Sequence, residues 1–66
     1  MKTIQLNSHD IESQSEHLAE LLIEQGYGGS IVATAVNGEF VPQGNRANTQ
    51  LQNGDRVEVL APMQGG

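Results

Sequence analysis

The chain has 66 residues, enough for one small domain, and its eight acidic and three basic residues give a formal net charge of −5. Proteins that bind nucleic acid or anionic membranes use clustered lysine and arginine, so this composition argues against both partners. Cysteine is absent, which excludes disulfides and cysteine-based zinc sites and leaves a thin hydrophobic core to hold the fold. The sequence shows no signal-peptide pattern and no apolar run long enough to span a membrane, so we expect a cytoplasmic protein.

The N-terminal residues predict a β-hairpin. Polar and apolar side chains alternate over residues 2–6, which is the pattern of a half-buried strand. Residues 7–10, Asn-Ser-His-Asp, have turn composition. Residues 11–13 are then expected to form a short return strand that pairs with the first.

A helix is predicted next, with one apolar stripe. Ser13 and Glu16 have the spacing of a capping box, and Ser15 is the alternative N-cap. Gly26 is placed to serve as the residue that ends the helix. The stripe that we expect to face the core consists mainly of leucine, with members at Leu18, Leu21 and Leu22.

A second hairpin is predicted in the middle of the chain. Residues 31–36 are a nearly continuous run of β-formers and small residues, which indicates a central strand. Asn37-Gly38 is a favoured two-residue hairpin turn, because both central positions require a positive φ. Residues 39–41 are the return strand, and Pro42 ends it because proline cannot donate a ladder hydrogen bond.

The C-terminal third predicts a polar loop and a last strand. Residues 43–50 indicate a surface loop, which Leu51 is expected to anchor in the core. A tight turn around Gly54 precedes residues 56–60, where the alternation points Val57 and Val59 inward.

The order of these elements predicts an α+β domain. A single main helix beside segregated strands gives two layers, and the first and last strands can lie parallel in the middle of a mixed sheet. This is the β-grasp, or ubiquitin-like, fold, with four to five strands packed on one main helix. We expect residues 1–60 to form the domain and residues 61–66 to form an exposed, flexible tail.

The tail ends in Gly65-Gly66, where the sequence places a C-terminal carboxylate on two residues without side chains. Such a carboxylate is ionised at neutral pH, with a reference pKa of about 3.3–3.7. It is a poor electrophile until it is activated. Two terminal glycines alone more often mark a frayed end than a functional one, so the case for a reactive terminus depends on the rest of the chain.

Three segments together resemble the thiamine-biosynthesis sulfur carriers of the ThiS family. They are the hairpin Ala-Val-Asn-Gly-Glu-Phe-Val-Pro at residues 35–42, the strand entry at 51–59, and Gln-Gly-Gly at 64–66. The resemblance extends over nearly the whole chain in length and element order. This family usually has an arginine after the hairpin proline and a tryptophan a few residues later, where this chain has Gln43 and, approximately, Arg46. The packing of that loop is therefore an open question.

The resemblance implies a reaction at one atom. An E1-like (ThiF-like) adenylyltransferase would use ATP and magnesium to adenylate the Gly66 carboxylate. A cysteine-persulfide sulfur donor would then convert it to a thiocarboxylate, and a ThiG-like thiazole synthase would take the sulfur. Gln64 and Gly65 would enter the partner's active site together with Gly66. The chain itself would have no catalytic residue, would bind no metal or cofactor, and would act as a carrier and not as an enzyme.

A docking surface for these partners is expected near the base of the tail. Phe40 and Leu60 are predicted to project from the sheet face opposite the helix, and Met63 lies in the tail itself. Exposed apolar side chains of this kind form protein-binding sites. The alternative is that Phe40 belongs to the core.

Three other interpretations remain. His9, Asp10, Glu12 and His17 lack metal-ligand spacing and are expected to be solvated. A sister sulfur carrier, such as the small subunit of molybdopterin synthase, is usually longer and approaches its diglycine differently. The third possibility is a ubiquitin-like modifier or a pure interaction domain. A modifier would form a conjugate with a target lysine, and a pure interaction domain would keep its function when the tail is deleted.

Overall fold

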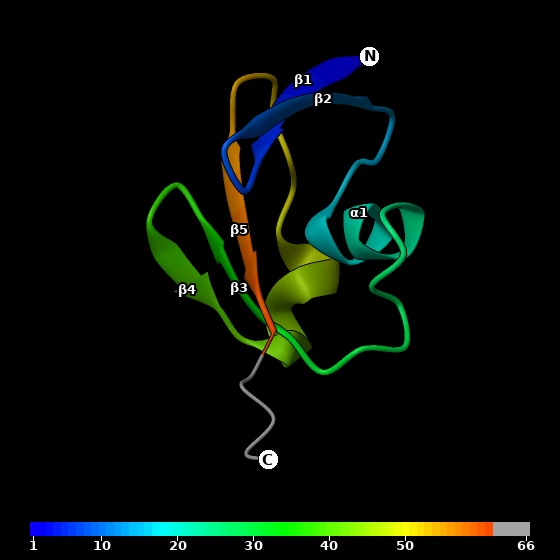
Figure 1. Ribbon diagram of the computed structural model, residues 1–66, viewed down its shortest axis with the longest axis vertical. Coiled ribbons are helices and arrows are strands. Elements are labelled where there is room, and N and C mark those ends of the chain that lie inside the picture. Colours follow the sequence, from blue (N-terminus) through cyan, green and yellow to red (C-terminus); the bar gives the residue numbers. More distant parts are fainter. Residues whose placement is uncertain (62–66) are drawn as a thin grey trace.

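The computed structural model describes residues 1–61, and within them five strands form one mixed sheet with α1 on one side of it (Figure 1). The order across the sheet is β2-β1-β5-β3-β4. The elements are β1 (Lys2–Leu6), β2 (His9–Ser13), α1 (Leu18–Glu24), β3 (Ala33–Val36), β4 (Glu39–Val41), the 3-10 helix η1 (Gln43–Asn48) and β5 (Arg56–Leu60).

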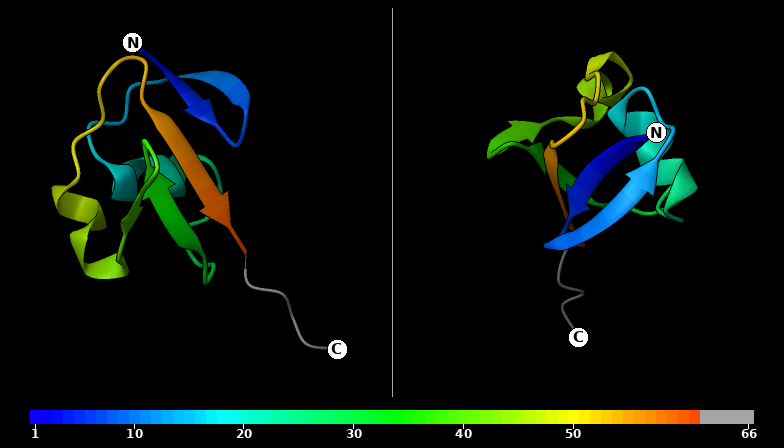
Figure 2. Two further views of the ribbon diagram at one scale, coloured as in Figure 1. Left: turned by 90° about the vertical axis from the view of Figure 1, so that its left-hand side faces the viewer. Right: turned by 90° about the horizontal axis from the view of Figure 1, so that it is seen from above.

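The first and last strands are parallel neighbours, as predicted. β5 is the central strand, because β1 pairs with it on one side and β3 on the other (Figure 2). The parallel register joins Gln5 to Arg56 and Leu6 to Val57. Each outer strand belongs to an antiparallel hairpin, β1–β2 or β3–β4. This arrangement is the predicted β-grasp fold.

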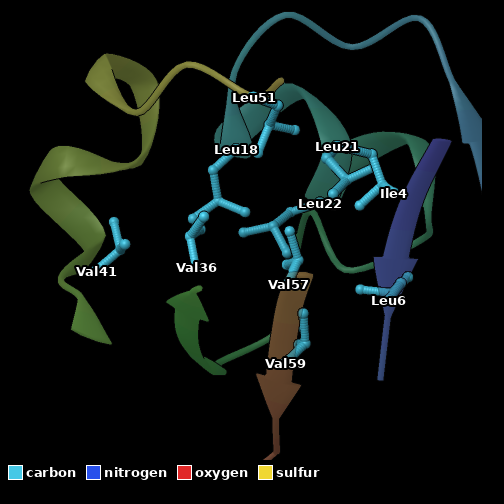
Figure 3. Packing of buried hydrophobic residues seen from close by; sticks show 10 residues of the cluster. All are labelled: Ile4, Leu6, Leu18, Leu21, Leu22, Val36, Val41, Leu51, Val57 and Val59. Atoms are coloured by element: carbon cyan, nitrogen blue, oxygen red, sulfur yellow. The ribbon is translucent and has the colours of Figure 1, made fainter. Parts of the chain in front are cut away.

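The core lies between α1 and the inward face of the sheet (Figure 3). The three leucines of α1 are all buried, which confirms the predicted stripe. Leu51 is buried as the predicted anchor, and the alternation of β5 points its two valines inward. The buried apolar side chains are Ile4, Leu6, Leu18, Leu21, Leu22, Val36, Val41, Leu51, Val57 and Val59.

The start of α1 differs from the prediction. Its N-cap is His17, whose Nδ1 accepts the backbone N–H of Glu20 at 3.2 Å, so neither serine caps it. Ser13 is still part of β2, where it pairs with Lys2. Its hydroxyl accepts the Ser15 N–H at 3.0 Å and donates to Glu24 at 2.7 Å. The serines therefore join the strand to the side of the helix and do not begin it.

The turns use positive φ angles, though one turn is shorter than predicted. Asn7 (φ 48°) and Ser8 (φ 72°) form the first turn alone, so β2 begins at His9 instead of residue 11. A two-residue turn with positive φ at both positions matches the twist of a hairpin, which explains why residues 9 and 10 join the strand. Asn37 (φ 53°) and Gly38 (φ 84°) form the second hairpin turn as predicted.

The predicted end of α1 is confirmed. Gly26 has a φ of 89° and follows the C-cap residue Gln25. Its N–H donates to Ile23 O at 3.1 Å, and the Tyr27 N–H donates to Leu22 O at 2.7 Å. These two bonds form a Schellman motif, which requires a left-handed residue at the position of Gly26.

Two segments after α1 depart from the prediction. The strand predicted from residue 31 begins at Ala33, and Ile31 is 85% exposed. Residues 31 and 32 have no partner strand, because the pairing of β3 with β5 ends at Ala33, which lies opposite Leu60. The loop predicted at 43–50 contains η1, in which the Asn45 N–H donates to Pro42 O at 2.9 Å.

Arg46 attaches η1 to the sheet and settles how the unusual loop packs. Its Nε donates to the Thr34 hydroxyl at 3.0 Å, and its Nη2 donates to the backbone carbonyl of Val32. The Thr34 hydroxyl in turn donates to the carbonyl of Val41 at 2.8 Å. A long side chain with several donors thus connects the loop to β3.

Candidate functional site

The candidate site begins at the exit of β5, the strand that leads to the end of the chain. Along it, buried valines alternate with exposed residues, and Leu60 is 66% exposed. Ala61 follows and is also exposed. The other predicted tail residues, Met63, Gln64, Gly65 and Gly66, lie outside the described residues, and the roles assigned to them stay predictions.

An exposed apolar surface adjoins this exit on the sheet face opposite α1, which faces the viewer in the left panel of Figure 2. Phe40 is 69% exposed, so it does not belong to the core. In the register of the sheet, Phe40 lies opposite Ala35, and Ala33 lies opposite Leu60. We call the surface formed by Ile31, Ala33, Phe40 and Leu60 the outer apolar patch.

A shallow apolar groove lies within this patch at the start of β3. Its lining comes from Ile31, Val32 and Ala33 on one side and from Leu60 and Ala61 on the other. The groove therefore meets the chain at the residue from which the tail continues. From the sequence, Ile31 was predicted to lie inside a strand, so its place in the lining of this groove was not predicted. The missing signal was the end of the ladder at Ala33, which depends on residues far along the chain.

One acidic residue, Glu58, borders the patch on β5. Glu58 is exposed and lies opposite Ala35, which is itself opposite Phe40. Arg56, exposed and two residues earlier on β5, lies on the same face. A partner that covers this surface would need apolar side chains around Phe40 and Leu60 and a cation that faces Glu58, because a buried unpaired carboxylate is costly.

The described residues show no metal site. No group of three or more His, Asp or Glu side chains that could hold a metal ion gathers within residues 1–61. His9, Asp10 and Glu12 are exposed, whereas His17 is half-buried and caps α1. In the same range, no helix is both long and apolar enough to cross a membrane.

A polar hollow lies at the β4 edge of the sheet. It is bordered by the turn of the second hairpin and by the chain after β4, and includes Asp55. Both oxygens of Asp55 are occupied: Oδ1 accepts from Asn37 Nδ2 at 3.0 Å, and Oδ2 accepts from the Gln52 N–H at 2.8 Å. These bonds hold two turns together, so Asp55 has a structural role.

The fold and the sequence define a class of protein: a small β-grasp domain whose last strand ends beside an apolar sheet face and whose sequence ends in two glycines. The ThiS family model matches residues 2–66, including the diglycine. The chain belongs to the ThiS family. No curated protein matches it.

Two solved structures are similar over nearly the whole chain. The crystal structure of a thiamine biosynthesis protein (ThiS) from Geobacter metallireducens has a TM-score of 0.82 and 25% identity, over 97% of this chain and 99% of that chain. An NMR structure of a thiamine biosynthesis protein from Geobacter metallireducens has a TM-score of 0.77 and 25% identity, over 97% of this chain and 87% of that chain. Family and fold together support a sulfur-carrier role in thiamine biosynthesis.

Proposed function

We propose that this chain carries sulfur on the C-terminal carboxylate of Gly66. An E1-like adenylyltransferase binds ATP and magnesium, and a Gly66 oxygen attacks the α-phosphorus and releases pyrophosphate. The terminal sulfur of a cysteine persulfide then attacks the acyl carbon and expels AMP. Cleavage of the remaining S–S bond by a thiol leaves the thiocarboxylate, which a thiazole synthase consumes.

One observation carries the proposal: the ThiS family match continues through Gln64, Gly65 and Gly66 to residue 66. Adenylation supplies a leaving group, so the acyl carbon becomes open to attack. The catalytic groups, ATP and magnesium belong to the partners. This chain supplies a folded domain that the partner binds and a C-terminal arm that positions one carboxylate. Glycine at the last two positions lets the arm enter a narrow channel.

The position of β5 limits where the partner must bind. Six residues follow Leu60, and a fully extended segment of this length spans at most about 20 Å. The reacting carboxylate must therefore lie within about 20 Å of Leu60 when the partner is bound. The outer apolar patch contains Leu60 itself, so it lies next to the point from which this distance is counted. We propose this patch, together with Met63, as the surface that the adenylyltransferase and the thiazole synthase contact.

Intact mass spectrometry tests the reaction. The protein is incubated with an E1-like enzyme, ATP, magnesium and a persulfide donor, and we expect a mass gain of one oxygen replaced by sulfur, confined to the C-terminal peptide. Gly66→Ala should lower adenylation severely and leave the unfolding temperature unchanged, whereas the surface control Gly44→Ala should be adenylated normally. An unchanged mass under active conditions would favour a pure interaction domain, and a conjugate on a target lysine would favour a modifier.

Two exposed apolar residues on opposite sides of the domain test the docking surface. Phe40 and Ile23 are each 69% exposed, but Ile23 lies on α1, away from the patch. Phe40→Ser should raise the KM of the adenylyltransferase for this protein by about tenfold, which corresponds to about 1.4 kcal/mol of binding. Ile23→Ser should leave it within about twofold. Equal effects of the two substitutions would rule out the outer apolar patch as the docking site.

A further inference from the structure

The central strand β5 loses a neighbour just before the chain leaves the sheet. On one side, β3 pairs with it from Val57 as far as Leu60. On the other side, the parallel pairing with β1 covers only Arg56 and Val57. The last residues of β5 would therefore be held along one edge alone, at the point from which the tail continues.

Asn7 occupies this missing position. It follows the last residue of β1 and has a φ of 48°, and its own N–H donates to Val57 O at 3.0 Å. Its side-chain Oδ1 accepts the Val59 N–H at 2.8 Å, and its Nδ2 donates to Val59 O at 3.1 Å. A carboxamide has the same donor and acceptor as a peptide group. The side chain thus extends β1 by one further peptide-like unit, while the main chain turns away into β2.

We propose that Asn7 is a positioning residue for the reaction at the C-terminus: it fixes the end of β5 and so sets where, and in which direction, this strand leaves the sheet. This inference rests on the proposed function. Without the carboxamide, the end of β5 is held by β3 alone and opens more readily. Opening from Val57 onward lengthens the arm from the six residues after Leu60 to the nine after Val57. The effective concentration of a tethered end falls roughly as the −3/2 power of length, so this lengthening alone lowers it about twofold, and loss of direction lowers it further.

Glycine is the informative substitution at this position. Asn7→Gly keeps the positive φ accessible and removes only the carboxamide. Ser8→Gly is the matched control, because Ser8 also has a positive φ (72°) in the same turn. Asn37→Gly is the positional control. Asn37 Oδ1 accepts the Arg56 N–H at 3.0 Å, so its loss loosens the opposite end of β5. Asn7→Asp, which keeps the acceptor for the Val59 N–H but loses the donor, should lie between wild type and Asn7→Gly.

Hydrogen exchange of the protein alone tests whether Asn7 fixes the strand. We expect the Leu60 amide to exchange about tenfold faster in Asn7→Gly, after correction for global opening measured at the buried Ile4 and Leu21. Ser8→Gly and Asn37→Gly should leave the corrected rate at Leu60 within about twofold. If Asn7→Gly also leaves the Leu60 rate unchanged, Asn7 does not hold the end of β5 and the inference is wrong.

Steady-state kinetics with an E1-like adenylyltransferase test the consequence for the reaction. A residue that orders the arm without contacting the partner should change kcat and not KM. We expect Asn7→Gly to lower kcat by about three- to tenfold with KM within twofold, and Asn37→Gly to leave both nearly unchanged. Equal loss in both variants would show a merely structural role. If wild-type protein gives no adenylate, the proposed function fails, while the exchange comparison still decides whether Asn7 fixes β5.

Discussion

The hydroxyl of Thr34 joins three parts of the domain, and its removal gives a sharp test of how the sheet is held to η1. Thr34 is 1% exposed. The hydroxyl donates to Val41 O at 2.8 Å and accepts from Arg46 Nε at 3.0 Å, so it connects β3 to β4 and to η1. Thr34→Val keeps the branched shape and removes both bonds.

The expected loss follows from those two bonds. A net contribution of about 0.5–1.5 kcal/mol for each bond gives a cost of about 2 kcal/mol. The new methyl group offsets at most about 0.8 kcal/mol of this cost. The net destabilisation is therefore about 1–2 kcal/mol, within a total stability of roughly 3–10 kcal/mol for a domain of this size. A change of that size lowers the unfolding temperature by about 5–15 °C.

A double-mutant cycle separates the Arg46 bond from the rest. Unfolding in urea is measured for Thr34→Val, Arg46→Met and the double variant, with Thr3→Val at an exposed position of β1 as the control. We expect the double variant to lose about 1 kcal/mol less than the sum of the single losses. The reasoning is refuted if the single losses add, or if Thr34→Val is as stable as Thr3→Val.

Three further substitutions test the core, a turn and the helix cap by thermal or urea unfolding. Leu21 is fully buried, so Leu21→Ala should cost about 2–5 kcal/mol, whereas Ile23→Ala at an exposed site of α1 should cost less than about 0.5 kcal/mol. Similar losses would contradict the assigned core. Gly54 has a φ of 92°, so Gly54→Ala should cost about 1 kcal/mol or more through backbone strain, and a neutral result would contradict that strain. Gly44→Ala serves as its control. His17→Ala should cost about 1 kcal/mol, because it removes the acceptor for the Glu20 N–H. His17→Asn should retain most of the stability, since asparagine is a good N-cap. Equal stability of these two variants would show that the cap contributes nothing.

The elements that local chemistry specifies were predictable from the sequence. The leucine stripe at 18, 21 and 22 has helical spacing, and the burial of all three follows from it. Asn37-Gly38 can form a turn that few other pairs form, so the hairpin around it was predicted correctly. The parallel pairing of the first and last strands followed from the element order, because a single helix between hairpins leaves few ways to close a two-layer sheet.

Features that depend on distant partners were predicted wrongly or not at all. Ser13 and Glu16 have the spacing of a capping box, but Ser13 is held in β2 by Lys2, and a histidine caps the helix instead. Ile31 has the composition of a strand residue, yet it is exposed because β5 offers it no partner. The turn residue Asn7 showed no local sign that its side chain would pair with Val59, 52 positions later.

The features of the candidate site also fall into those that the local sequence pattern predicted and those that it did not. Exposure of Leu60 followed from the clear alternation of β5. The placement of Phe40 did not follow, because a strand of three residues, β4, is too short for its pattern to show which face is buried. The roles of Gly65 and Gly66 came from the family resemblance and not from any pattern of burial or charge.

The central place of β5 has a consequence for how the protein is made. During synthesis, both hairpins and α1 leave the ribosome before the strand that joins them, because β5 begins only at Arg56. Long-range pairing of this kind slows folding, since a long loop must close before the contacts form. A product truncated before Arg56 would consist of two hairpins without a common sheet, open to degradation. Completion of the sheet therefore requires translation beyond Arg56, so a folded domain forms only after nearly the whole chain has been made.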